Sequence, residues 1–232
     1  MITVYPRKKL DFTYLNIFKA LLYTFAPFTN KNNVDVDIEN LWPDHNVIIG
    51  LSVRSIFDLL LTQKKYKNGC EVIMSGITIP DMVKIVEAHD LNVVPVDIDM
   101  QSLQVSEASI SNAITEKTVM VIIAHLFGSR MDMDPIYKAL ENRPDIMIVE
   151  DCAQAYGGID LYKKQNNTHL SMFSFGSIKS ITALGCAIGF TTNDKLYSDL
   201  KEGFLKYDRI ANSRFRSKVL KYFLLKILCN QV

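Results

Sequence analysis

Two short polar segments in the middle of the sequence carry side chains that could do chemistry, and each follows an apolar run. The first is Glu150–Gln154 (EDCAQ), which places two carboxylates and an amide directly after Ile146–Val149. A carboxylate at the end of a buried strand can pair with a cationic ligand atom, and the amide of Gln154 can hydrogen-bond another. The alternative interpretation is an ordinary turn in which Asp151 caps the next element.

The second segment is Phe173–Lys179 (FSFGSIK), which combines hydroxyl groups, one glycine and one lysine. Hydroxyls and backbone N–H groups in a tight turn suit an anion such as phosphate, although the P-loop pattern is absent. Lys179 is the only charged residue between Ser171 and Thr192. Lysines are rarely buried without a partner, so either its amine extends to solvent or it is a functional group. A desolvated amine has a lowered pKa and can form a Schiff base with a carbonyl.

His125 is a third candidate, because it follows the strongly apolar run Val119–Ile123 (VMVII). A lone histidine at such a position is more often a structural hydrogen-bonding group than a catalyst, and both interpretations stay open from the sequence. The other three histidines have no partner pattern.

Short apolar runs alternate with amphipathic stretches through the middle of the chain, and this alternation sets the fold class. Apolar runs without polar alternation are typical of strands in a parallel sheet that helices cover on both faces. We therefore predict an α/β fold with a mostly parallel central sheet, in which ligands bind at the carboxyl ends of the strands. The predicted strands are Glu71–Met74, Val93–Val96, Val119–Ile123, Ile146–Val149, Met172–Phe175 and Ala187–Thr192, and the predicted helices are Asp81–His89, Ser106–Ile114 and Met133–Leu140.

The two polar segments together resemble those of one protein family. An Asp-x-Ala-Gln turn is followed, 28 positions after its aspartate (179 − 151), by the lysine of a Ser-Phe-x-x-x-Lys pattern. This pairing is similar to that of the DegT/DnrJ/EryC1/StrS family of pyridoxal 5'-phosphate (PLP)-dependent sugar aminotransferases, of fold type I. The resemblance extends over roughly residues 50–200. Four further segments resemble the family's in the same order: Gly69–Ile73 its GDEVI, Val96–Asp99 its VDID, His125–Gly128 its HLYG and Thr191–Asp194 its TND.

The resemblance implies a role for each residue that matches a family position. Lys179 matches the lysine that forms a Schiff base with PLP and then moves the proton between cofactor and substrate. Asp151 matches the carboxylate that pairs with the pyridinium nitrogen and keeps the ring protonated, so that it accepts electrons. Ala153 matches the residue against the ring face, Gln154 matches the contact to the phenolic oxygen, and Ser174 matches a ligand of the cofactor phosphate.

Three segments depart from the family's pattern. Gly50–Leu59 stands where the family has a segment like SGTxALxLAL, and its Arg54 and Ser55 fall near the phosphate-binding positions. A guanidinium and a hydroxyl at a helix N-terminus can bind phosphate, and the alternative is that Arg54 is a surface residue. Residues 75–80 (SGITIP) lack the aromatic residue that the family often has near the cofactor ring, and Gly185 stands alone where the family has two glycines.

Composition excludes several classes of protein. Of the 232 residues, 48% are apolar and 22% charged, which excludes an intrinsically disordered chain. A net charge of +1 gives no general attraction for nucleic acid or an anionic membrane, so any binding comes from a local site. Four scattered cysteines predict neither a disulfide framework nor a metal site, and fit a cytoplasmic setting. Tyr14–Phe28 and Val219–Cys229 are too short or too charged to span a bilayer, which leaves packing on protein or attachment to a membrane surface.

We expect three segments along the chain. Residues 1–45 match no family motif, residues 46–200 form the PLP-binding large domain, and residues 201–232 form a basic helical segment. Because the family's fold continues into a smaller C-terminal domain, the resemblance also implies that this domain is missing or truncated here.

The function that the resemblance implies is transfer of an amino group, with glutamate as donor, to a keto group of a nucleotide-linked sugar in polysaccharide or amino-sugar biosynthesis. The family's sites are built at a dimer interface, so a homodimer is expected, and His125 is assigned to the substrate. One alternative is a truncated, non-catalytic or regulatory member of the same fold. Another is a PLP-dependent sugar dehydratase, whose relatives carry histidine where this chain has Lys179.

Overall fold

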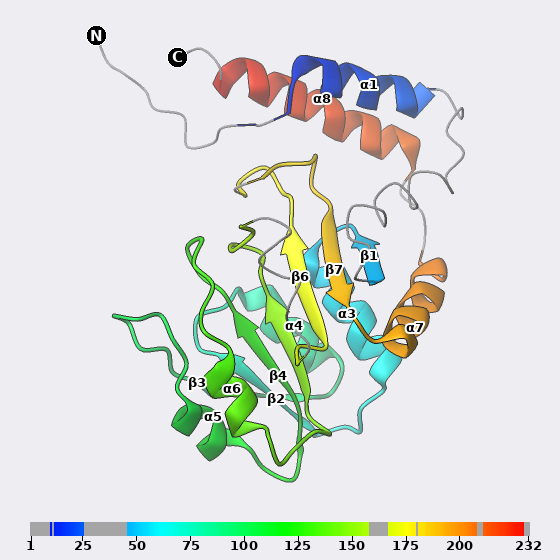
Figure 1. The fold of residues 1–232 in the computed structure, drawn as a ribbon. Helices are drawn as coiled ribbons and strands as arrows, with labels where there is room; N and C mark the ends of the chain where they lie inside the picture. The colour runs from blue at the N-terminus through cyan, green and yellow to red at the C-terminus, as the bar shows by residue number, and fades with distance from the viewer. Residues whose placement is uncertain are drawn as a thin grey trace.

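The computed structural model describes residues 10, 12–25, 46–157, 167–179, 181–207 and 211–229. Its centre is one seven-stranded sheet in the order β1-β7-β6-β5-β4-β2-β3 (Figure 1). The neighbouring strands from β3 to β6 run parallel, whereas β7 is antiparallel to both β6 and β1. The predicted α/β class with a mostly parallel sheet is therefore confirmed. The strands are β1 (Asn46–Gly50), β2 (Glu71–Ser75), β3 (Asn92–Val96), β4 (Thr118–Ala124), β5 (Met147–Asp151), β6 (Leu170–Ser174) and β7 (Ala187–Thr191).

Helices cover both faces of the sheet, and alternate residues of β4 contact different helices. Met120 and Ile122 belong to a core cluster with residues of α3, α4 and α7, whereas Val121 and Ile123 pack in a second cluster with α5 and α6. Because both faces of β4 are buried, its sequence does not alternate between apolar and polar residues. The helices are α1 (Tyr14–Phe25), α3 (Val53–Lys64), α4 (Pro80–Ala88), α5 (Glu107–Ala113), α6 (Asp134–Ala139), α7 (Asp194–Leu205) and α8 (Asn212–Cys229).

All nine elements predicted in the middle of the chain are present, with ends that differ by at most two residues. The start of α4 follows from its sequence, since Pro80 in the first turn needs no intrahelical N–H partner. Strand β1 was not predicted. It pairs with β7, and Asn46 lies opposite Thr191 in that pair.

Four strands end and one begins at the same edge of the sheet. Ala124 at the end of β4 pairs with Asp151 at the end of β5, which pairs with Met172 on β6. At the end of β6, Ser174 lies opposite Ala187, the first residue of β7, and Gly50 at the end of β1 lies on the other side of Ala187. The loops that carry the predicted site residues therefore leave the sheet at the same edge.

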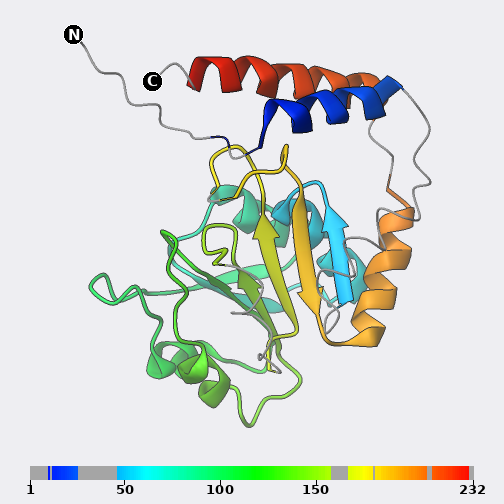
Figure 2. The same cartoon turned by 45° about the horizontal axis from the view of Figure 1, so that its top comes forward.

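Helices α1 and α8 form an antiparallel pair that lies beyond this edge of the sheet (Figures 1 and 2). Near one end of the pair, Nε of Arg216 donates to Oγ1 of Thr24 at 3.2 Å. Towards the other end, the rings of Tyr14 and Phe223 meet edge to face, with their centroids 6.2 Å apart. The described parts of the two apolar stretches noted in the sequence thus pack on each other. Within the described ranges, no helix is both long and apolar enough to cross a membrane.

Candidate active site

Lys179 lies on the loop between β6 and β7, at the edge where the parallel strands end. A backbone hydrogen bond from Phe175 to the carbonyl of Cys186 (2.9 Å) closes the base of this loop. The N–H of Lys179 donates to the carbonyl of Gly176 at 3.0 Å, which makes a tight turn. A Cβ on Gly176 would lie 3.8 Å from Oγ of Ser174 and 3.9 Å from Cγ of Lys179. The Ser174 hydroxyl and the Lys179 side chain therefore both border the space beside Gly176.

Asp151, the last residue of β5, interacts electrostatically with Lys179. Its side chain is buried, and its Oδ1 accepts a hydrogen bond from the N–H of Ala153 at 3.0 Å. Burial raises the pKa of Asp151, while the Ala153 N–H and the charge of Lys179 act in the opposite direction. Burial lowers the pKa of Lys179, Asp151 raises it, and the charge of Arg54 lowers it again. Carboxylate, amine and guanidinium therefore share one site.

The N-terminus of α3 reaches this edge directly from β1. Oγ of Ser52 accepts from the N–H of Ser55 at 3.2 Å, and Oγ of Ser55 accepts from the N–H of Ser52 at 3.1 Å. This capping box satisfies two backbone donors and fixes the start of the helix. Next to it, Nη1 of Arg54 lies 2.7 Å from Oδ2 of Asp81 on α4. Because its charge also lowers the pKa of Lys179, Arg54 is an ion-paired residue at the border of the site.

Gln154 connects the loops that follow β4 and β5. Its Oε1 accepts a hydrogen bond from the N–H of Phe127 at 3.3 Å, and its side chain is exposed. Ala153 is half-buried and packs against the core cluster under α3 and α4. The structure thus brings Asp151, Ala153 and Gln154 to the same edge of the sheet as Lys179.

A buried network at the end of β5 was not predicted from the sequence. The fully buried carboxylate of Glu150 accepts from Nε2 of His125 at 2.7 Å and from Nη2 of Arg130 at 2.7 Å. Its other oxygen accepts from the Thr168 hydroxyl at 2.5 Å. Burial alone would raise the pKa of Glu150, but the hydrogen bonds from His125 and Thr168 and the charge of Arg130 outweigh it and lower the pKa. The sequence signal was the second carboxylate of the EDCAQ segment, since a buried glutamate requires partners.

His125 is wholly enclosed in this network. Its Nδ1 accepts from the N–H of Met131 at 3.1 Å, so both ring nitrogens have protein partners, and the side chain is not exposed. This geometry favours the structural interpretation of His125 over contact with a substrate. Among the described residues, His125, Glu150 and Cys152 hold potential metal-ligand atoms within 4.8 Å of one another. A cation there would meet the guanidinium of Arg130 on the same carboxylate oxygen, so the group is a positioning network rather than a metal centre.

Comparison with known proteins identifies the family of the chain. The model of the DegT/DnrJ/EryC1/StrS aminotransferase family matches residues 52–219, which include the segments of Asp151 and Lys179. The chain belongs to this family. The resemblance predicted from the sequence is thereby confirmed, and the DegT/DnrJ/EryC1/StrS proteins are PLP-dependent sugar aminotransferases.

Individual relatives of this DegT-family chain have two activities. An L-glutamine:2-deoxy-scyllo-inosose aminotransferase from Micromonospora echinospora is 37% identical over 89 residues, 38% of this chain and 21% of the relative. A GDP-4-keto-6-deoxy-D-mannose 3-dehydratase from Yersinia pseudotuberculosis is 35% identical over 144 residues, 60% of this chain and 36% of the relative. The E. coli 3-dehydratase solved with bound hydrated PLP has a TM-score of 0.71 and 19% identity, over 87% of this chain and 54% of that one. This last likeness is one of fold, and the matches span about half of these proteins' length or less.

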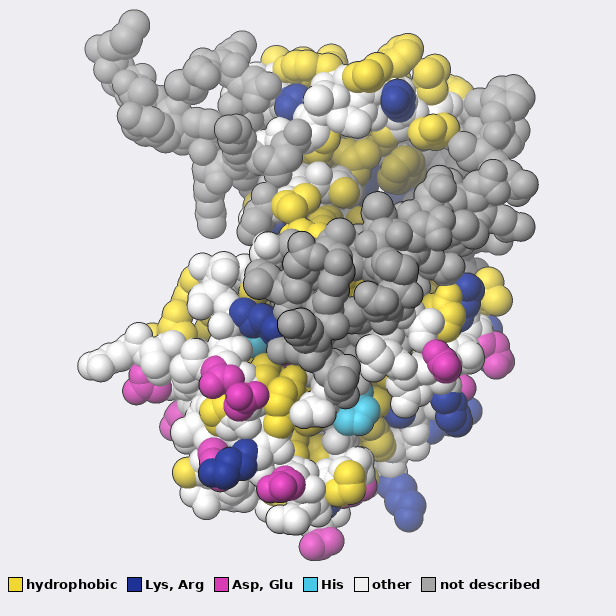
Figure 3. Space-filling model, in the orientation of Figure 1, with side chains coloured by type: hydrophobic (Ala, Val, Ile, Leu, Met, Phe, Trp, Pro, Cys, Tyr) yellow, Lys and Arg dark blue, Asp and Glu magenta, His cyan; other side chains and the backbone are white. Residues whose placement is uncertain are grey.

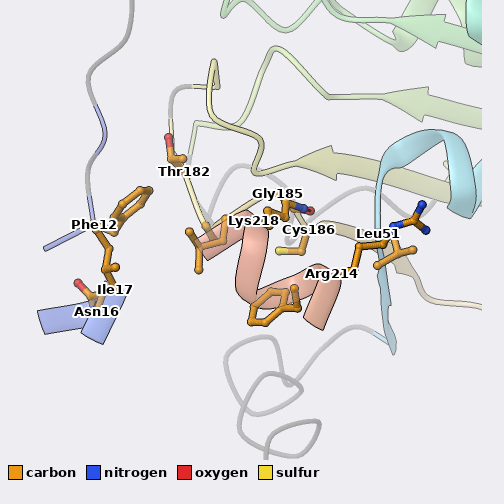
Figure 4. A pocket seen from close by; sticks show the side chains of 12 residues that line it. Phe12, Asn16, Ile17, Leu51, Thr182, Gly185, Cys186, Arg214 and Lys218 are labelled. Carbon is orange, nitrogen blue, oxygen red and sulfur yellow. Dashed lines mark hydrogen bonds between the residues drawn. The ribbon is translucent and has the colours of Figure 1, made fainter. Parts of the chain in front are cut away.

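A cavity of about 750 Å³ lies between α1, α8 and the loop that follows Lys179 (Figure 4). Aromatic and aliphatic side chains make up much of its wall, and Arg214 and Lys218 of α8 are its charged residues within the described part of the chain. Nζ of Lys218 donates to the carbonyl of Gly185 at 3.3 Å. The hydroxyl of Thr182 also borders the cavity, is buried, and has no hydrogen-bond partner among the described residues. The cavity therefore combines apolar walls with two cations and an available hydroxyl.

Proposed function

We propose that the chain carries the cofactor-binding part of a PLP-dependent aminotransferase that acts on the keto group of a sugar. The observation that carries the proposal is the placement of Asp151 at the end of β5 and of Lys179 on the loop after the neighbouring strand β6, where the two groups interact electrostatically. A partly buried amine with a lowered pKa suits Schiff-base chemistry, and a carboxylate beside it suits a protonated ring nitrogen. Membership of the DegT/DnrJ/EryC1/StrS family supports the same assignment.

The residues at this edge fit PLP chemically. Lys179 would hold the aldehyde carbon, Asp151 the ring nitrogen, and Gln154 the phenolic oxygen. The phosphate would bind between the hydroxyl of Ser174 and the N-terminus of α3, where backbone N–H groups and the helix dipole favour an anion. The charge of Arg54 would add to this attraction, and Ser55 would contribute through the start of the helix that it caps.

Each of these side chains has a defined task in amino transfer. PLP, when bound, supplies the electron sink for the substrate carbon that loses a proton. The amine of Lys179 takes up that proton and returns it, and burial favours the neutral form that this requires. Asp151 would pair with the ring nitrogen and keep it protonated, and the positive ring would favour the ionised carboxylate against the effect of burial. The Glu150 network fixes the backbone next to Asp151, so that the carboxylate keeps its direction.

The substrate we propose is a nucleotide-linked keto sugar. The cavity beside the Lys179 loop supports this, because Arg214 and Lys218 can bind a diphosphate and the apolar walls can contact a base. The relatives are named for 2-deoxy-scyllo-inosose and for GDP-4-keto-6-deoxy-D-mannose; both compounds carry a keto group, and the second is linked to a nucleotide. Glutamate as amino donor, a cytoplasmic homodimer and a role in polysaccharide or amino-sugar biosynthesis complete the proposal.

A sugar dehydratase is the second candidate, because the Yersinia pseudotuberculosis relative with that activity is 35% identical. Lys179 favours the aminotransferase, since the dehydratases that the motif resembles carry histidine at this position. A primary amine can form a Schiff base and be regenerated after each transfer, which an imidazole cannot do.

Cofactor binding is tested by titrating the purified chain with PLP. We expect an absorbance band near the visible edge, and after borohydride reduction a covalent adduct at Lys179 that mass spectrometry locates. Lys179→Ala removes both signals, whereas Lys138→Ala, an exposed lysine on α6, keeps them. A wild-type chain that folds but gives neither signal overturns the proposal.

The reaction is tested with GDP-4-keto-6-deoxy-D-mannose and glutamate. Formation of an amino sugar supports the aminotransferase, and formation of a 3-deoxy sugar selects the dehydratase. Arg214→Ala and Lys218→Ala are each expected to raise KM by roughly tenfold through loss of a charge-assisted contact, with the PLP band unchanged. An unchanged KM in both variants excludes the cavity as the nucleotide site.

A further inference from the structure

The outward side of α1 carries an exposed apolar stripe. Leu15, Phe18 and Leu22 follow one another at spacings of three and four residues, which places them on one side of the helix. Their exposed fractions are 60%, 57% and 51%. The buried residues of α1, Ile17 and Thr24, lie on the opposite side. The stripe is therefore additional to the face with which α1 packs on its own protein.

Helix α8 repeats the arrangement. Leu220, Leu224 and Leu228 recur every four residues and are 47%, 60% and 69% exposed. Val219 and Tyr222, on the other side of the helix, are buried. Figure 3 shows hydrophobic side chains gathered over the α1 and α8 pair, with Lys or Arg side chains among them. Contiguous exposed apolar surface of this kind marks an interaction site.

The charge of the two helices is wholly positive. Neither contains an aspartate or a glutamate, while α1 has one lysine and α8 has five lysines and arginines. Because the whole chain has a net charge of +1, these six cations leave the rest of the chain at −5 (+1 − 6). Lys19 follows Phe18 and Lys221 follows Leu220, and both lysines are exposed beside their stripes. Such a long side chain can lie along an apolar surface while its amine reaches a phosphate.

We propose that this α1/α8 surface, made of the two outward stripes with Lys19 and Lys221, binds an anionic lipid bilayer. The helices lie in the interface, with leucine and phenylalanine side chains among the acyl chains and the lysines at the headgroups. The attachment that we propose is peripheral, because the apolar stripes lie along the sides of the two helices.

A second copy of the chain is a poorer occupant of the same surface. A symmetric contact through these stripes would bring Lys19 and Lys221 of both copies together, with no carboxylate on either helix to compensate. An anionic bilayer supplies that charge. The cavity residues Arg214 and Lys218 are not part of the stripes, so lipid binding leaves the proposed substrate cavity free.

The proposal is tested by sedimentation of the purified chain with lipid vesicles. The chain is expected to pellet with an equal mixture of phosphatidylcholine and phosphatidylglycerol, and to release as salt is added. Phosphatidylcholine alone should retain much less of it. Neutralising Lys19→Gln or Lys221→Gln should weaken binding about fivefold each. Leu224→Ser should weaken it roughly tenfold through lost apolar contact.

Met100→Ser is the matched control, since Met100 is 69% exposed, close to the 60% of Leu224, but lies outside both helices. A tryptophan placed at 224 in a Trp42→Phe background gives a second readout, because Trp42 is the only tryptophan of the sequence. Its fluorescence should shift to the blue with anionic vesicles, and that of a tryptophan placed at 100 should not.

Binding that does not depend on lipid charge, or no binding by a folded chain, overturns the proposal. A dimer that Leu224→Ser dissociates while vesicles have no effect assigns the surface to a second copy instead. The PLP band is expected to stay unchanged in these variants, so failure here is distinguishable from failure of the proposed activity.

Discussion

Nε2 of His125 lies 2.7 Å from Oε2 of Glu150, and neither side chain is exposed to solvent. Because Nδ1 accepts from the N–H of Met131, the ring hydrogen resides on Nε2 and His125 donates to the carboxylate. His125, the residue after β4, thus holds the side chain of Glu150, which precedes Asp151 on β5. This buried pair fixes the backbone next to Asp151 from inside the protein.

Removing the Glu150 carboxylate is expected to destabilise the fold strongly. Glu150→Ala leaves the guanidinium of Arg130 and the ring of His125 without their acceptor inside the protein. Breaking a buried ion pair from one side costs about 3–5 kcal/mol of unfolding free energy, which urea denaturation measures. Glu107→Ala is the control, because its pair with Lys138 is 43% and 69% exposed and contributes less than about 1 kcal/mol. Equal losses in the two variants contradict the network.

The tautomer of His125 is a second expectation. With Nδ1 acting as acceptor, ¹⁵N NMR of the folded chain should find the ring hydrogen on Nε2. His169 serves as comparison, since its Nδ1 accepts from the N–H of Ile148 at 3.0 Å and predicts the same tautomer. The His125→Gln spectrum assigns the resonance. A proton found on Nδ1 of His125 contradicts the hydrogen-bond geometry.

The strands and helices were predictable where the local sequence reflects their burial. The run Val119–Ile123 is apolar at every position because helices cover both sides of β4, and Pro80 marks the start of α4. Strand β1 was missed because its partner is β7, which lies far away in the sequence. Asn46, for example, pairs with Thr191. The short run Val47–Ile49 is the only local signal of that pairing.

The candidate site was predictable to the extent that it rests on strand ends. Asp151 and Lys179 were expected at one edge because parallel strands deliver their carboxyl ends there, and the electrostatic interaction between them agrees. The partners of Glu150 were not predictable. Arg130 and Thr168 reach it from loops whose course depends on tertiary packing, 20 and 18 positions away.

Gly203 offers a test of how α7 packs on α3. In an open helix, alanine in place of glycine stabilises by about 1 kcal/mol. Here the new Cβ would lie 2.8 Å from Cδ1 of the buried Leu59 and would also meet Gln63. Gly203→Ala is therefore expected to lower the unfolding free energy by about 1–2 kcal/mol in urea. Glu202→Ala, an exposed neighbour, should change it by less than about 0.5 kcal/mol, and a more stable Gly203→Ala chain would refute the packing.

Asp151 is expected to reduce the stability of the cofactor-free chain at neutral pH. Burial raises its pKa in the folded state, so with rising pH the unfolded chain loses this proton first, near the ordinary value of about 3.9. Folding then becomes less favourable until the raised pKa is passed. Asp151→Asn removes this loss, and the amide oxygen can still accept from the N–H of Ala153.

Urea denaturation across this pH range checks the sign of the Asp151 effect. Asp151→Asn should match the wild type in acid and exceed it at neutral pH, while the PLP band weakens because the ring nitrogen loses its carboxylate. Asp99→Asn should behave in the opposite way, since hydrogen bonds from Ser102 and Gln101 lower the pKa of Asp99 and make its ionised form stabilising at neutral pH. A pH-independent difference between the wild type and Asp151→Asn would mean that the carboxylate bears no cost of burial. In that case Lys179 alone would compensate the carboxylate of Asp151 in the fold. Cofactor binding would then not be needed to offset a buried charge.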